Sequence, residues 1–175
     1  MKIYKFANIT VRPYPNMCDV NNKWIFTPEI GVVVNVSQKY KTDIVEAIKQ
    51  KGIEYFHFPL DEEVPDIGWE NIKNAVKVLF ECEKLGKHIL VHCDGGNHRS
   101  RLVVEAYHYA KTGTHYTDEY KGFDNHLIYD CRSGYLLPLE GVEAELKNIK
   151  NGTSLDAPVA VHGRKPGGYF HSFTM

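Results

Sequence analysis

The stretch at residues 92–100 constrains the fold of this chain more than any other feature. It follows an apolar run at residues 89–91 that is typical of a strand, and it leads into a helical pattern at residues 101–107. A glycine-bearing loop is therefore predicted between the end of a strand and the start of a helix. Backbone N–H groups and the positive end of the helix dipole converge at such a loop, so an anion should bind there.

A cysteine opens this loop and an arginine closes it, with five residues between them. Cys93 would lie within a ring of amide donors and beside a guanidinium, which should keep it as a thiolate near neutral pH. Arg99 is planar and always charged, so it can bind two phosphoryl oxygens at once. The two side chains supply a nucleophile and an oxyanion clamp for a phosphate ester. Because the amides and the arginine neutralise the phosphoryl charge, no metal or other cofactor is expected.

The same stretch resembles the signature of the cysteine-dependent protein phosphatases, which is His-Cys, two residues, Gly, two residues, Arg and then Ser or Thr. Every fixed position is present, namely His92, Cys93, Gly96, Arg99 and Ser100. The run at residues 34–37 resembles a strand of the dual-specificity branch. The resemblance covers roughly residues 30–112 and is looser in the C-terminal third. It implies a protein tyrosine phosphatase-like fold and hydrolysis through a cysteinyl-phosphate. The alternative is a glycine-rich turn around a buried structural cysteine.

The order of apolar patterns predicts an α/β fold. An unbroken β-branched run at residues 31–36 predicts a central strand covered on both faces. A helix follows, which Thr42 or Asp43 caps and which runs through about Gln50. After it come a strand at 53–60, a helix at about 68–85, and a strand from His88. This alternation is typical of parallel βαβ units. A single domain is expected, with a central, mostly parallel sheet flanked by helices.

The patterns near the two ends of the chain predict secondary structure less clearly than those of the middle part. Short alternating pieces at residues 3–6 and 24–26 indicate one or two edge strands within the first 30 residues. Helical patterns recur at about 116–131 and 139–149, and these helices should pack on one face of the sheet. The catalytic domain is expected to span 1–150. Residues 151–175 are rich in glycine and proline and are expected to form a C-terminal tail or strap.

A general acid is expected on the loop after the predicted strand at residues 53–60. Ligands of parallel sheets lie beyond the carboxyl ends of the strands, so this loop and Cys93 should share one edge. The resemblance implies that Asp61 is the acid, which would protonate the leaving group and then activate water as a base. Competing carboxylates in the same loop are Glu62, Glu63 and Asp66. Alternatively, the loop is a solvated acidic turn that caps the helix at Trp69.

Other residues of the signature have supporting roles. Ser100 can donate a hydrogen bond to the departing thiolate, and it can also cap the first turn of the helix. His92 is expected to orient the loop backbone, with a structural strand-end histidine as the alternative. Backbone amides of the loop should bind the phosphoryl oxygens, and they come from Asp94, Gly95, Gly96, Asn97, His98 and Arg99. The side chains of Asn97 and His98 are candidates to line the mouth of the site.

The loop also carries clues to the substrate. Asp94 is acidic, and no lysine lies between Cys93 and Arg99, so a highly phosphorylated inositol would be partly repelled. We therefore expect a single phosphate on a protein side chain, as phosphotyrosine or phosphoserine/threonine, and a phosphorylated protein or peptide as partner. The alternatives are a phosphatase for RNA 5′-phosphate or an inositol phosphate, and a phosphate-binding module with little turnover. A rhodanese-type sulfurtransferase ranks last because its loop is shorter and lacks the closing arginine.

Net charge and cysteine content limit the possible binding partners and the cellular compartment. A formal net charge of −1 argues against the broad basic surface that nucleic-acid binding needs, and no apolar run approaches the length of a membrane span. The four cysteines lack metal-ligand spacing, and no signal-peptide pattern opens the chain, so a reducing, cytoplasmic setting is expected. Cys82 is interpreted as a packing residue. Cys18 and Cys131 are candidates for a protective disulfide with an oxidised Cys93.

Overall fold

The computed structural model describes residues 4–6, 8–61, 68–113 and 143–150. Its elements are β1 (Tyr4–Phe6), β2 (Ile9–Arg12), α1 (Met17–Asn21), β3 (Ile30–Asn35), α2 (Thr42–Gln50), β4 (Glu54–His57), α3 (Trp69–Lys84), β5 (His88–His92), α4 (Arg99–Thr112) and α7 (Glu143–Lys150). The strands form one sheet in the order β1-β2-β5-β3-β4. Strands β2, β5, β3 and β4 are parallel, and β1 pairs with β2 in antiparallel orientation. The predicted single α/β domain with a mostly parallel sheet is confirmed.

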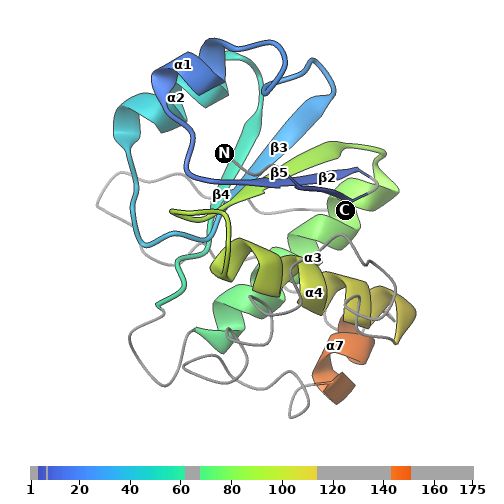
Figure 1. The fold of residues 1–175 in the computed structure, drawn as a ribbon. Helices are drawn as coiled ribbons and strands as arrows, with labels where there is room; N and C mark the ends of the chain where they lie inside the picture. The colour runs from blue at the N-terminus through green and yellow to red at the C-terminus, as the bar shows by residue number, and fades with distance from the viewer. Residues whose placement is uncertain (1–3, 7, 62–67, 114–142, 151–175) are drawn as a thin grey trace.

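Helices cover both faces of this sheet. Figure 1 shows α1 and α2 on one side of the sheet, and α3, α4 and α7 on the other. Alternate residues of β3 pack into two different hydrophobic clusters, because successive side chains of a strand point to opposite faces. Val32 and Val34 belong to the cluster that includes α3 and α4, whereas Val33 belongs to the cluster that includes α2. The β-branched run therefore forms an interior strand, as predicted.

The first 30 residues match the sequence prediction only in part, because β1 is an edge strand, as the pattern at residues 3–6 predicts. Strand β2 is not an edge strand, because it pairs with β5 in parallel and with β1 in antiparallel orientation. The predicted strand piece at residues 24–26 is absent, since this segment forms turns after the short helix α1. Helix α1 is stabilised by a capping box in which Asn16 and Asp19 exchange side-chain to backbone hydrogen bonds. At residues 24–26 the N–H of Trp24 bonds to Asn22 Oδ1, and the N–H groups of Ile25 and Phe26 bond to the Asn22 carbonyl, so turn hydrogen bonds replace the predicted strand.

Two further predictions need correction. The strand predicted at residues 53–60 ends at His57 in the structure, and residues 58–60 continue as a loop along the carboxyl end of β3. The backbone N–H groups of Phe58 and Leu60 bond to the carbonyls of Asn35 and Val36 there, outside a regular strand ladder. Helix α2 begins at Thr42, but the residue at its N-cap is Lys41, which makes no side-chain capping bond. Neither Thr42 nor Asp43 is the cap residue.

The C-terminal third is only partly described. Helix α7 overlaps the helix predicted at 139–149 and packs against α3 and α4, so these two helices separate it from the sheet. The helix predicted at 116–131 and the tail or strap predicted at 151–175 lie outside the described residues. Within the described parts of the chain, none of the helices combines the length and apolar character needed to span a lipid bilayer.

The carboxyl ends of the four parallel strands meet at one edge of the sheet. Arg12 of β2 is in register with His92 of β5, His92 with Asn35 of β3, and Asn35 with His57 of β4. The loops that follow these residues must therefore lie side by side. This edge places the loop after β5 between segments that follow β2 and β3.

Candidate active site

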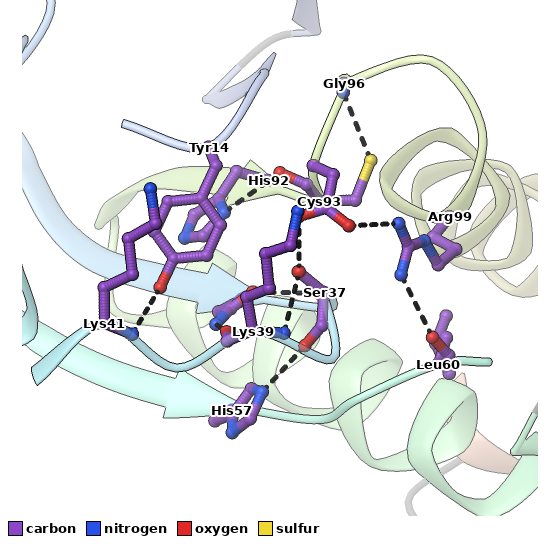
Figure 2. A network of polar contacts seen from close by, with 12 residues as sticks. Tyr14, Ser37, Lys39, Lys41, His57, Leu60, His92, Cys93, Gly96 and Arg99 are labelled. Atoms are coloured by element: carbon purple, nitrogen blue, oxygen red, sulfur yellow. Dashed lines mark hydrogen bonds and ion pairs between the residues drawn. The ribbon is translucent and has the colours of Figure 1, made fainter. Parts of the chain in front are cut away.

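The loop that joins β5 to α4 surrounds the sulfur of Cys93. The side chain is only 2% exposed, and its Sγ accepts a hydrogen bond from the backbone N–H of Gly96 at 3.2 Å. The hydroxyl Oγ of Ser100, in the first turn of α4, lies 3.3 Å from the same sulfur. Figure 2 shows Cys93, Gly96 and Arg99 around this one loop. The predicted contacts of Cys93 with a loop amide and with Ser100 are thus present.

Gly96 is required by the geometry of the loop. Its φ is +71°, a left-handed conformation that residues with a Cβ adopt at a cost. A Cβ at this position would also lie 2.5 Å from the backbone carbonyl carbon of Arg12 and 2.6 Å from the nitrogen of Pro13. The loop therefore packs directly on the chain that leaves β2. The glycine of the signature lets the Gly96 amide turn toward Cys93 Sγ.

Arg99 lies at the start of α4 and is held by two acceptors. Its Nη1 donates to the backbone carbonyl of Leu60 at 3.3 Å, and its Nη2 donates to Asp94 Oδ2 at 2.7 Å. The residue is 8% exposed. These two contacts fix the position of the guanidinium beside the Cys93 loop. The remaining loop positions are Gly95 and Asn97, which are exposed, and His98, which is partly buried.

Asp94 connects Arg99 to the segment that follows β3. Its second oxygen, Oδ1, accepts a hydrogen bond from Ser37 Oγ at 2.8 Å and lies 3.3 Å from Lys39 Nζ. Burial opposes ionisation of this carboxyl, but the hydrogen bonds from Arg99 and Ser37 outweigh burial and lower its pKa below the ordinary value. Asp94 is therefore a carboxylate at neutral pH.

Ser37 and Lys39 were not anticipated from the sequence. They lie on the turn after β3, which Asn35 holds by accepting from the Ser37 N–H at 2.8 Å and donating to the Lys39 carbonyl at 2.8 Å. His57 Nε2 lies 2.7 Å from the Ser37 carbonyl oxygen, which fixes the same turn from β4. The signal that points to these residues is their place at the carboxyl end of a strand next to β5.

His92 lies beneath the loop and is completely buried. Its Nδ1 lies 3.4 Å from the Cys93 carbonyl oxygen, its Nε2 lies 3.5 Å from the hydroxyl of Tyr55, and the ring of Tyr14 packs edge-on at 4.5 Å. Burial lowers the pKa of His92 to about 3, so the imidazole is neutral at physiological pH. These contacts fit the predicted role of orienting the loop backbone and do not suit a proton carrier.

The predicted general acid follows directly on a residue that contacts Arg99. Asp61 is partly buried and comes after Leu60, whose carbonyl accepts the Arg99 hydrogen bond. The segment before it is fixed, because the Leu60 N–H bonds to the Val36 carbonyl and the Asn71 side chain donates to the Pro59 carbonyl at 2.7 Å. The competing carboxylates Glu62, Glu63 and Asp66 lie outside the described residues.

Two of the other cysteines, Cys18 and Cys82, lie on helices. Cys82 is buried on α3, and burial raises the pKa of its thiol to about 12, as expected of a packing residue. Cys18 is exposed on α1, and Cys18, Cys82 and Cys93 are all free thiols. Cys131, the other candidate for a disulfide with Cys93, lies outside the described residues. Across the described ranges, no three His, Cys, Asp or Glu side chains gather closely enough to hold a metal ion.

A buried cysteine, a loop amide and an arginine at this spacing are what a nucleophilic attack on a phosphate ester requires. The model of one protein family, the catalytic domain of dual specificity phosphatases, matches residues 20–127. The chain belongs to this family. The matched segment extends from α1 past α4, so it contains β3, β4, β5 and the Cys93 loop.

Individual relatives agree with this assignment. A fowlpox virus protein named "Probable dual specificity protein phosphatase H1 homolog" is 34% identical over 95 residues, which are 54% of this chain and 51% of the viral protein. The chain thus spans about half the length of this curated relative. The crystal structure of DUSP15 matches with a TM-score of 0.67 and 16% identity over 90% of this chain and 98% of that one.

A second solved structure is the core catalytic domain of the PP-IP phosphatase SIW14 from S. cerevisiae. It matches with a TM-score of 0.63 and 15% identity, over 87% of this chain and 93% of that chain. At such identities the two structural likenesses show the fold alone. Family membership and site geometry agree on the Cys93 loop as the candidate active site.

Proposed function

We propose that this chain hydrolyses phosphate monoesters on protein side chains, as phosphotyrosine or phosphoserine/threonine, through a cysteinyl-phosphate intermediate. The observation that carries the proposal is the position of Cys93 Sγ, which lies 3.2 Å from the Gly96 nitrogen and 3.3 Å from Ser100 Oγ in the loop that Arg99 closes. These donors favour a negatively charged sulfur and a negatively charged phosphoryl group at the same place.

In the first step the Cys93 thiolate attacks phosphorus in line with the ester oxygen. A phosphorus–sulfur bond forms and the phosphorus–oxygen ester bond breaks, while Arg99 and the loop amides bind the equatorial oxygens. The leaving oxygen takes a proton from the carboxylic acid of Asp61. The product alcohol or phenol then leaves, and the phosphoryl group stays on sulfur.

In the second step water attacks the cysteinyl-phosphate. The Asp61 carboxylate, now a base, takes a proton from this water as the phosphorus–sulfur bond breaks and inorganic phosphate forms. The sulfur leaves as a thiolate, and the hydroxyl of Ser100 donates a hydrogen bond that stabilises its charge. Cys93 and Asp61 return to their starting states.

A phosphorylated protein or peptide is the proposed substrate because of the charge at the site. Asp94 is a carboxylate within the phosphate-binding loop, and it disfavours an ester that carries further phosphates beside the reacting one. SIW14 acts, by its name, on PP-IP, and the likeness to it supports the fold only. The same proposal puts the reaction in a reducing, cytoplasmic setting, because an oxidised Cys93 could not act as a nucleophile.

A substrate panel tests the proposal. One peptide is prepared with phosphotyrosine and with phosphothreonine at the same position, and a phosphoinositide and an RNA 5′-phosphate are added at equal concentration. Released phosphate is measured for the unmodified chain, for Cys93→Ser as the blank, and for Cys18→Ser as a matched control. Cys18 is an exposed thiol on α1, so its replacement should leave the rate unchanged.

The proposal predicts release from one or both phosphopeptides, faster than from the other esters, with no release by Cys93→Ser. Faster turnover of the phosphoinositide or the RNA would reassign the substrate to a non-protein ester. If no ester is hydrolysed but phosphopeptide still binds the reduced protein, the chain is a phosphate-binding module and the proposed activity is wrong.

A further inference from the structure

The guanidinium of Arg99 already binds a carboxylate. Its Nη2 donates to Asp94 Oδ2 at 2.7 Å, the distance of a charge-assisted hydrogen bond. Its Nη1 donates to the Leu60 carbonyl, and Figure 2 shows Arg99 between this carbonyl and the Cys93 loop. A carboxylate oxygen and a phosphoryl oxygen accept hydrogen bonds from the same guanidinium atoms. Asp94 therefore uses binding capacity that a phosphate ester also needs.

Asp94 has a second set of donors that does not involve Arg99. Its Oδ1 accepts from Ser37 Oγ at 2.8 Å and lies 3.3 Å from Lys39 Nζ. Ser37 is fully buried, and its backbone N–H is fixed by Asn35, so this contact does not depend on a mobile side chain. When an ester takes Arg99, the carboxylate can keep these two partners. Its charge then stays beside the bound phosphate.

That charge carries an energetic cost for the substrate. A carboxylate a few ångströms from a phosphate dianion is repelled in the partly buried loop, where screening by water is weaker than in bulk. The cost grows with each further negative group on the substrate. Arg99 and Lys39 offset part of it, but Lys39 has 64% of its side chain exposed and is a weak partner.

We propose that Asp94 competes with the substrate phosphate for Arg99, and that its charge, which Ser37 and Lys39 hold at the site, selects against esters that carry a second anion beside the reacting phosphate. This inference rests on the proposed function and names a specificity-determining residue for it. Asp94 need not touch the reacting atoms to act in this way. It sets how much of the Arg99 binding energy is left for the phosphate.

Phosphate affinity tests the competition directly. Cys93→Ser serves as the parent, so that binding of inorganic phosphate can be measured by calorimetry without turnover. The additional change Asp94→Asn keeps the size of the side chain and removes its charge, and it should tighten phosphate binding about tenfold. Glu46→Gln on the same parent is the control, because it removes one exposed negative charge from α2. It should change affinity less than twofold. Asp94→Ala should act in the same direction as Asp94→Asn.

Selectivity is tested with Cys93 intact. Two phosphopeptides are compared, one with neutral residues and one with glutamates on both sides of the phosphorylated residue. Asp94→Asn should raise kcat/KM for the acidic peptide at least threefold more than for the neutral one. If Asp94→Asn binds phosphate equally or more weakly while the unmodified chain hydrolyses phosphopeptide, Asp94 only positions Arg99 and this inference alone is wrong. If the unmodified chain neither binds phosphate nor hydrolyses any ester, the inference and the proposed function both fail.

Discussion

The backbone carbonyl of Leu60 accepts a hydrogen bond from Arg99 Nη1 at 3.3 Å, although the two residues are 39 positions apart in the chain. The contact joins two loops that have different tasks in the proposed reaction. One loop carries the nucleophile Cys93, and the other continues into Asp61. Asp61 is the residue after Leu60. Because the Leu60 carbonyl is bonded to Arg99, the backbone of Asp61 is held close to the phosphate-binding arginine.

Replacing Asp61 by Asn should slow hydrolysis in a way that depends on the leaving group. Without a proton donor, a poor leaving group such as a serine or threonine alkoxide should depart about 100-fold more slowly or worse. An aryl phosphate with an acidic phenol needs little protonation and should lose much less. Steady-state kcat is measured for both esters in both chains.

The control for Asp61→Asn is Asp43→Asn, which alters an exposed acid in the first turn of α2 and should leave both rates unchanged. An equal loss of rate for both leaving groups would show that Asp61 is not the proton donor. The acid would then be Asp66 or one of the glutamates of the same loop.

Ser100→Ala should slow the second step more than the first. The hydroxyl lies 3.3 Å from Cys93 Sγ, and losing a hydrogen bond to a charged sulfur should reduce the breakdown of the cysteinyl-phosphate about 10- to 100-fold. Rapid-mixing experiments with an aryl phosphate should then show a burst of phenol followed by slow turnover. Thr112→Ala, at the other end of α4, is the control and should behave like the unmodified chain. Slowing of the burst itself would contradict this role for Ser100.

Gly96→Ala should destabilise the chain more than the same change at another left-handed glycine. Both Gly96 and Gly113 have positive φ, at +71° and +78°, but only at Gly96 would a Cβ approach backbone atoms within 3 Å, whereas nothing lies within 4 Å at Gly113. We expect a loss of about 3 kcal/mol in the free energy of unfolding for Gly96→Ala and about 1 kcal/mol for Gly113→Ala. Urea unfolding measures both. Equal losses in the free energy of unfolding would mean that the Cys93 loop shifts to accommodate the added methyl group at little cost.

His92 should make the chain sensitive to acid. Burial lowers its pKa to about 3, whereas an unfolded histidine titrates near 6.5, so protons favour the unfolded chain as the pH falls between these values. Relative to His92→Gln, the unmodified chain should therefore lose stability from about pH 6.5 downward, by roughly 4 to 5 kcal/mol at most. The pKa of His57 is also lowered, mainly by burial, and that effect is present in both chains and cancels in the comparison. Parallel curves of unfolding free energy against pH would contradict the assignment.

The sequence predicted the part of the fold whose patterns are local. The apolar run of β5, the loop glycine and the helical period of α4 each point to the same strand, loop and helix, and the contacts of Cys93 with Gly96 and Ser100 follow from that order. Strand β2 escaped prediction because it is short and ends in a fully buried arginine. Its pairing with β5 joins segments about 80 residues apart, which no local pattern records.

The residues around Asp94 were missed for a similar reason. Ser37 and Asp94 are 57 positions apart, and their hydrogen bond depends on β3 lying beside β5 in register. The sequence suggested the negative charge of Asp94 but not its partners, which determine where that charge is held. The rule that loops at the carboxyl ends of parallel strands meet would have pointed to Ser37 and Lys39.

The most direct test of the proposed reaction is to find the phosphoryl group on sulfur. The chain is mixed with a phosphotyrosine peptide for milliseconds, quenched in acid and digested, and the phosphorylated residue is located by mass spectrometry. Ser100→Ala, in which breakdown should be slow, raises the amount trapped. We predict phosphate on Cys93 and on no other residue, and none in Cys93→Ser. Rapid turnover with no phosphate on Cys93, in the unmodified chain or in Ser100→Ala, would contradict the account.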